Sequence, residues 1–237
     1  PHFEKMLYDN TQFILLLSKY CKINNEKYFK DKLEQTVEFL KKDFLNEDKL
    51  LGSAYDADSE GEEGKYYVYS FDELKDIKQI SEYFEVSPSG NWENKNILVE
   101  KKTPPKEILE KLLGIRKKRK KPFFDSKSQL DLNCLWISAL VAAHEILPEK
   151  KYLNLAEEFF SIIEEKYLKK NIQHSYSKGI VFLEDYAFLI NSLNDLSDKT
   201  MNFKYKNYAK KLCKEAFLKF YIKEKDIFQK NQKNNND

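Results

Sequence analysis

Five acidic residues crowd one short loop of the chain, and carboxylates are side chains that proteins use to move protons and to bind cations. They are Asp56, Asp58, Glu60, Glu62 and Glu63. A calcium loop would begin at Asp56, but its twelfth position is Tyr67, where a bidentate Glu is needed. Alternatively, Asp56 or Asp58 could act as acid or base, with Asp185 as the opposing carboxylate. The acids could also cap backbone N–H groups in a purely structural loop.

A polar stripe near the start of the chain offers a second group. On a helix, His2, Lys5, Asp9 and Gln12 would lie within about 80° of one another. Lys5 and Asp9 could form a surface ion pair worth about 0.3–0.5 kcal/mol. Alternatively, the stripe could line a cleft in which Asp9 orients His2. Both alternatives stay open on the residues alone.

Histidines and aromatic residues complete the candidates. His2 and His174 could supply the two acid/base groups that an epimerase places on opposite faces of one sugar carbon. Two histidines also converge easily by chance. Tyr8, Trp92 and Tyr186 could stack on a sugar ring, although aromatic residues at helical spacing usually belong to a core. Asp185 could cap its helix or face the cleft.

The elements that must position these residues are mainly helices. Apolar residues at helical spacing predict three αα-hairpins, in the segments 2–21 with 26–45, 130–146 with 150–168, and 183–197 with 203–222. An insertion of loops and strands follows the first hairpin. It contains a strand at 65–69, a helix capped by Ser70 with Glu73, a strand at 96–100 and a helix at 105–117. Two further short strands are expected within 171–182. The hairpins predict an incomplete (α/α)6 toroid in one domain over residues 1–230, followed by a polar tail at 231–237.

Composition excludes several classes of protein. The 41 basic and 39 acidic residues give a net charge of +2, which does not indicate a nucleic-acid partner. The basic run at 116–121 is typical of a solvated loop, although it could bind phosphates. Cys21, Cys134 and Cys213 lack the spacing of a zinc site or a disulfide framework, so we expect reduced core thiols and neither metal nor cofactor. No apolar run predicts a membrane span or a signal peptide, which favours a cytoplasmic protein.

Several strings resemble one family. The longest are residues 1–10 (PHFEKMLYDN) and 55–69 (YDADSEGEEGKYYVY), and shorter matches follow at 91–98, 138–140, 174–176 and 183–187. Their order and spacing are similar to the helical region of the spermatogenesis-associated-protein-20-like, thioredoxin-domain-containing family. That region resembles the six-hairpin glycosidase superfamily, which includes N-acylglucosamine and cellobiose 2-epimerases. The resemblance implies a sugar-sized cleft, and an N-terminal thioredoxin-like domain that this chain, beginning at Pro1, lacks. We therefore expect a chain that is truncated at both ends.

The resemblance also implies site residues. We expect acid/base chemistry from His2, Asp9, Asp56, Asp58, His174 and Asp185, and contacts with a small sugar ligand from Glu4, Lys5, Tyr8, Trp92, Asn133 and Tyr186. One departure concerns the string Trp-Asn-Gly of the family, which is Leu132-Asn133-Cys134 here. The loss of a ring and a glycine puts sugar stacking and activity at this position in doubt. The hypotheses are therefore an epimerase- or hydrolase-like domain, a non-catalytic binding or scaffold domain, and an inactive paralogue.

Overall fold

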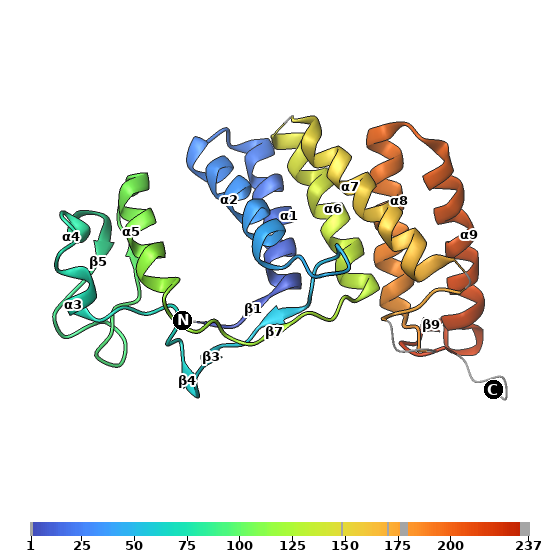
Figure 1. Cartoon of the computed structure of the whole chain (residues 1–237). Helices are drawn as coiled ribbons and strands as arrows, with labels where there is room; N and C mark the ends of the chain where they lie inside the picture. Colours follow the sequence, from blue (N-terminus) through green and yellow to red (C-terminus); the bar gives the residue numbers. More distant parts are fainter. Residues whose placement is uncertain (1, 148, 170, 176–179, 233–237) are drawn as a thin grey trace. The chain divides into compact units, whose positions relative to one another are not determined.

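A computed structural model describes residues 2–147, 149–169, 171–175 and 180–232 (Figure 1). The chain forms two compact units. Unit 1 contains Pro1–Lys5 and Tyr55–Phe124, and unit 2 contains Met6–Ala54 and Asp125–Asp237. The chain passes between them within three two-residue strands, β1 (Lys5–Met6), β2 (Ala54–Tyr55) and β7 (Phe124–Asp125). That residues 1–230 act as one domain stays a prediction.

Unit 2 contains the three αα-hairpins. They are α1 (Leu7–Ile23) with α2 (Lys27–Asp43), α6 (Leu130–Ile146) with α7 (Lys150–Ile163), and α8 (Leu183–Thr200) with α9 (Phe203–Phe220). A π-helical turn, η1 (Glu164–Leu168), extends α7. After α9 come the strands β8 (Tyr221–Ile222) and β9 (Ile227–Phe228), joined by a 3-10 turn, η2 (Lys223–Lys225), and paired antiparallel. The first helix of each hairpin packs against the next, so α1, α6 and α8 form one row.

Helix α6 is the centre of this unit because it is apolar on almost every face. Trp136, Ile137, Ala139 and Leu140 follow one another closely, and all are buried. The helix contacts α1 on one side, α8 on the other and α7 behind. In contrast, α7 buries only one stripe, which includes Tyr152, Ala156 and Phe159. The helices α1, α6 and α8 all begin on the same side of this row (Figure 1).

The first helix begins later than predicted. Met6 is extended, with φ −95° and ψ 141°, and the N–H of Leu7 donates to the carbonyl of Ser53 at 2.9 Å. The helix therefore starts at Leu7, and the expected helical stripe from His2 to Gln12 is wrong for His2 and Lys5. The ammonium of Lys5 instead donates to the carbonyl of Phe3 at 2.7 Å and lies over the ring of Tyr67.

Unit 1 is built from short elements. They are the hairpin of β3 (Asp58–Ser59) and β4 (Glu62–Glu63), the helices α3 (Phe71–Leu74), α4 (Ile80–Tyr83) and α5 (Lys106–Arg116), and the antiparallel pair β5 (Phe84–Glu85) and β6 (Val99–Glu100). A small apolar core joins the helices, with Leu74, Ile80, Phe84, Ile108 and Leu112 among its members. The predicted capping box of Ser70 and Glu73 is confirmed.

The predicted strand at 65–69 is wrong, because residues 64–67 form a turn. Gly64 adopts φ +70°, and its carbonyl accepts from the N–H of Tyr67 and of Val68. Arg119 then donates to the carbonyls of residues 65, 66 and 68 and pairs with Glu73 at 2.7 Å. A side chain thus satisfies the carbonyls that a neighbouring strand would have paired.

Other predictions fall partly outside the described residues. Of the two strands expected within 171–182, the described part contains only a single bridge from Phe182 to Asn231, and 176–179 lie outside it. The turn expected at Pro148 and most of the polar tail, 233–237, also lie outside. Among the described helices, none is both long and apolar enough to cross a bilayer.

Candidate functional site

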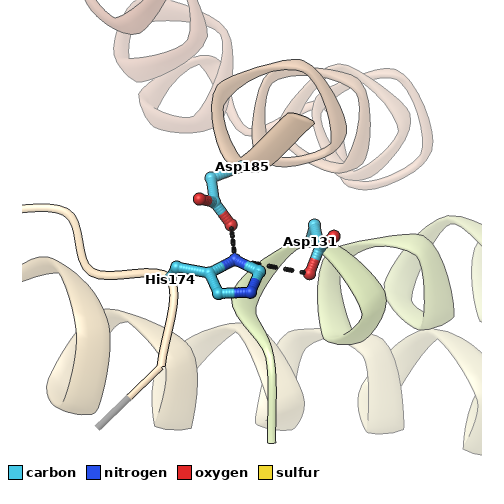
Figure 2. Close-up of side chains that lie close together, drawn as sticks. All are labelled: Asp131, His174 and Asp185. Carbon is cyan, nitrogen blue, oxygen red and sulfur yellow. Dashed lines mark hydrogen bonds and ion pairs between the residues drawn. The ribbon is translucent and has the colours of Figure 1, made fainter. Parts of the chain in front are cut away.

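A buried group of titratable side chains lies where α6 and α8 begin. Asp131 is the second residue of α6, and Asp185 is the third residue of α8. His174 precedes α8, and its carbonyl accepts from the N–H of Leu130 at 2.8 Å. This bond fixes the backbone of His174 beside the start of α6. The start of α6 and the stretch from His174 to Asp185, which begins 43 residues after Asp131, therefore bring one imidazole and two carboxyl groups together (Figure 2).

Both carboxyl groups approach the same ring nitrogen. His174 Nδ1 lies 2.8 Å from Asp185 Oδ1 and 3.9 Å from Asp131 Oδ1 (Figure 2). The side chain of Asp185 is 0% exposed, and those of His174 and Asp131 are 18% and 16% exposed. The ring of Phe182 packs against that of His174 at 5.0 Å in a T-shaped arrangement. The geometry is that of a histidine oriented by a buried carboxylate.

The two carboxyl groups differ in their partners. Asp185 Oδ2 accepts from the N–H of Phe182 at 2.9 Å, so this residue also caps α8. Burial raises the pKa of Asp185, although the Phe182 N–H and the His174 ring favour its charged form. Burial also raises the pKa of Asp131, and the charge of Asp185 raises it further. Asp131 Oδ1 is buried and has no hydrogen-bond partner among the described residues.

The other ring nitrogen of His174 contacts a second polar chain. Its Nε2 lies 2.9 Å from Gln129 Nε2. Gln129 Oε1 lies 3.0 Å from Ser53 Oγ, which in turn lies 2.7 Å from the carbonyl oxygen of Lys127. The imidazole is therefore held at both nitrogens, and its ring plane is fixed.

Two kinds of chemistry suit this arrangement. A histidine paired with a buried carboxylate can accept or donate a proton near neutral pH. The same atoms can also ligate a cation, since one ligand atom from each of Asp131, His174 and Asp185 lies within 4.8 Å of the others. Among the described residues, no other group of three or more His, Cys, Asp or Glu side chains lies this close together.

The remaining predicted residues of unit 2 lie in other surroundings. Asp9 and Tyr8 are exposed in the first turn of α1. Asn133 is buried and bonds the N–H and carbonyl of Leu51 and the carbonyl of Gln129. The buried hydroxyl of Tyr186 accepts from Lys219 at 2.7 Å. Of the predicted acid/base residues, the structure brings His174 and Asp185 together.

The predicted residues of unit 1 are mostly exposed. His2, Glu4, Asp56 and Asp58 all have exposed side chains. Trp92 packs edge-on against Phe3, with ring centroids 5.0 Å apart. Burial, together with the charge of Arg116, lowers the pKa of Lys5 to about 8.

Sequence reasoning missed Asp131 and Gln129. Both lie at the start of a helix whose bounds the sequence predicted correctly, residues 130–146. The signal was the carboxylate in the first turn, the same position that made Asp185 a candidate. The first turns of α1, α6 and α8 each carry an aspartate, Asp9, Asp131 and Asp185.

Comparisons with known proteins place this geometry in context. No family model matches the chain. Over 90% of its length the chain is 24% identical to spermatogenesis-associated protein 20 of Homo sapiens, and over 93% it is 27% identical to an uncharacterized protein of Caenorhabditis elegans. It spans 35% and 38% of these relatives. The resemblance inferred from the motifs is confirmed.

Three solved structures with similar folds are named as two sugar epimerases and a D-mannose isomerase. A sugar epimerase from a ruminal bacterium matches 97% of the chain with a TM-score of 0.63 at 12% identity, and the match covers 48% of the epimerase. Cellobiose 2-epimerase from Spirochaeta thermophila matches 93% with a TM-score of 0.58 at 10% identity, covering 45% of that enzyme. A D-mannose isomerase matches 90% with a TM-score of 0.57 at 12% identity, covering 40%. These matches confirm the predicted mainly α, (α/α)-toroid fold class.

Proposed function

We propose that this protein is a sugar-processing (α/α) toroid in which His174, oriented by Asp185 and assisted by Asp131, transfers protons to and from a small reducing sugar. The observation that carries the proposal is the 2.8 Å contact between His174 Nδ1 and the fully buried Asp185. The fold supports the substrate class, because the similar structures are named as sugar epimerases and an isomerase. A fold alone does not fix an activity, so the proposal depends on the site.

The chemistry explains why such a pair is suitable. Epimerisation beside a carbonyl and aldose–ketose isomerisation both begin with the loss of a proton from the carbon next to the carbonyl. The base must titrate near neutral pH, as histidine does. The Asp185 carboxylate would hold the ring and compensate the positive charge that develops on it. Because burial raises the pKa of Asp131, its carboxyl keeps a proton to a higher pH than an exposed aspartate and can return it to the sugar.

Of the other predicted acid/base residues, Asp9 remains a candidate within this proposal. Asp9 lies in the first turn of α1, and in Figure 1 this helix begins on the same side of the row as α6 and α8, whose first turns hold Asp131 and Asp185. His2, Asp56 and Asp58 belong to unit 1, and the proposal gives them no role. A thioredoxin-like domain preceding this chain and a cytoplasmic location are predictions that accompany the proposal.

Proton exchange with solvent tests the proposal directly. The protein is incubated in D2O with D-mannose, D-glucose or cellobiose, and deuterium at carbon 2 is followed by NMR. We expect exchange with at least one sugar, and a 10²- to 10⁴-fold slower rate in His174→Ala, the range typical of a general acid/base group. Asp185→Asn should also be slower, because an amide cannot stabilise the imidazolium. Asp56→Asn, an exposed aspartate of unit 1, is the matched control and should exchange like the wild type.

Two outcomes would contradict the proposal. Equal exchange in the wild type and in His174→Ala would remove the site from the chemistry. No exchange with any sugar, together with a rise in melting temperature on sugar addition, would favour the alternative of a domain that binds sugar without turnover. The firm hold on both nitrogens of His174 is the observation that favours this alternative.

A further inference from the structure

The protons around His174 can be assigned from the polar chain beside it. Ser53 Oγ has a single proton and two neighbours, the carbonyl oxygen of Lys127 at 2.7 Å and the amide of Gln129 at 3.0 Å. A backbone carbonyl can only accept, so the shorter contact takes the proton. A hydrogen bond at the 3.0 Å contact then needs Gln129 as the donor. The structure places the amide oxygen of Gln129 toward Ser53, and a half-turn of the amide, which exchanges two ends of nearly equal shape, puts the NH2 there.

This assignment decides which nitrogen of His174 carries hydrogen. With the NH2 of Gln129 toward Ser53, its oxygen faces His174 Nε2 at the 2.9 Å contact. The oxygen can only accept, so Nε2 must carry a hydrogen. A neutral ring then has a bare lone pair on Nδ1, which points at Asp185 Oδ1 only 2.8 Å away. A lone pair facing a carboxylate is repulsive, so either a proton or a metal ion must lie between Nδ1 and Asp185 Oδ1.

A proton on Nδ1 removes only part of this repulsion. The resulting imidazolium carries one positive charge and faces two carboxyl groups, Asp185 at 2.8 Å and Asp131 at 3.9 Å. Asp131 Oδ1 would still lack a hydrogen-bond partner within the described part of the chain. Buried polar groups without partners are uncommon and call for an explanation. A dipositive ion would balance both carboxylates and give Asp131 Oδ1 a bond.

We propose that Asp131, His174 and Asp185 form a binding site for a divalent transition-metal ion, with Nδ1, Oδ1 and Oδ1 as ligand atoms. One imidazole with two carboxylates suits ions such as Zn²⁺, Mn²⁺ or Co²⁺. Two ligands each about 2.1 Å from an ion lie about 3.0 Å apart at a right angle, close to the contact between His174 and Asp185. Three protein ligands leave room for water or a substrate oxygen. Sequence spacing could not predict the site, because its ligands come from separate segments.

The groups around the ligands fit this role. A metal-bound histidine is normally fixed by a bond from its other nitrogen, and Gln129 supplies that bond here, itself held by Ser53. Asp185 is anchored by the N–H of Phe182 through its other oxygen. The metal would take the place of the proton on Nδ1, so metal binding and proton transfer by that atom exclude each other. The inference uses the residues of the proposed function but does not depend on sugar chemistry.

Titration with Co²⁺ in the absence of sugar tests the site. We expect a visible d–d spectrum that saturates at one equivalent and is displaced by Zn²⁺. Asp131→Asn and His174→Ala should abolish saturable binding, and Gln129→Ala should weaken it about 10- to 100-fold through loss of the orienting bond. The matched controls are His144→Ala, a histidine of the same helix α6, and Asp198→Asn, an exposed aspartate of α8. Both controls should bind Co²⁺ like the wild type.

Folding and function can be separated from metal binding. Asp131→Asn is nearly isosteric and should fold, so its loss of binding would not reflect unfolding, and circular dichroism checks this. Wild-type protein that binds Co²⁺ no more tightly than Asp131→Asn would overturn the metal site. Deuterium exchange in a metal-free wild type would leave the proposed function standing in that case. Metal binding without exchange would support the metal site alone.

Discussion

Two regions of this chain carry acidic side chains in different surroundings. The loop of residues 56–63 holds five carboxylates, and the first turns of α6 and α8 hold one each at the candidate site. In the loop, Glu60 and Gly61 take positive φ angles, and β3 pairs with β4 around them. All five acidic side chains are exposed, and Lys65 lies within 3.6 Å of Glu60 and Glu62.

The helix starts show the opposite arrangement. Asp185 is fully buried, Asp131 is mostly buried, and both face one histidine. Water screens the charges of the loop, whereas burial raises the pKa of both aspartates at the helix starts. The comparison teaches that a dense run of carboxylates is weaker evidence for chemistry than single carboxylates brought together from separate helices.

The largest difference should appear on removal of one carboxylate from each region. Asp185→Ala leaves His174 and the N–H of Phe182 without their buried acceptor, and we expect unit 2 to lose about 2–4 kcal/mol of unfolding free energy. Asp56→Ala in the exposed loop should cost about 0.5 kcal/mol or less. Urea unfolding followed by circular dichroism measures both. In a Trp92→Phe background the remaining tryptophan, the buried Trp136 of α6, reports on unit 2. Equal losses for the two variants would remove the contrast between the regions.

A smaller effect tests whether the buried Asn133 stabilises the fold or contacts a ligand. Asn133 was predicted to contact substrate, but its amide bonds Leu51 twice and Gln129 once. Asn133→Ala should therefore lower the unfolding free energy of unit 2 by about 2 kcal/mol, because three backbone contacts lose their partner. The measurement is urea unfolding monitored by Trp136, with the exposed Asn91→Ala of unit 1 as control. A variant that is as stable as the wild type but binds sugar less tightly would restore the original prediction.

Local sequence rules predicted the helices well and the site only in part. The bounds of α6 were predicted correctly because its apolar run is long and continuous. The start of α1 was missed by five residues, since the bond from Leu7 to Ser53 joins segments 46 residues apart. The turn at 64–67 was mistaken for a strand because aromatic residues favour strands, while Gly64 and Arg119 decide the local conformation. Asp131 was missed because its importance depends on a distant contact, with His174 43 residues away.

The pH dependence of stability gives the smallest and most specific test of the contrast. The folded-state pKa of Asp131 is raised above its ordinary value, so the folded protein binds this proton more tightly than the unfolded chain. The contribution of Asp131 to stability is therefore most favourable at low pH and is lost as the pH rises through the raised pKa. Asp131→Asn removes the buried charge, and in metal-free buffer it should stabilise unit 2 by about 1 kcal/mol at pH 7.5 and have almost no effect at pH 4. Urea unfolding at both pH values in the Trp92→Phe background checks this.

Asp56→Asn should show no such pH-dependent gain, because its carboxylate is exposed in both states. A gain for Asp131→Asn that is larger at pH 4 than at pH 7.5 would mean that the folded protein stabilises the carboxylate, and the raised pKa of Asp131 would then be wrong.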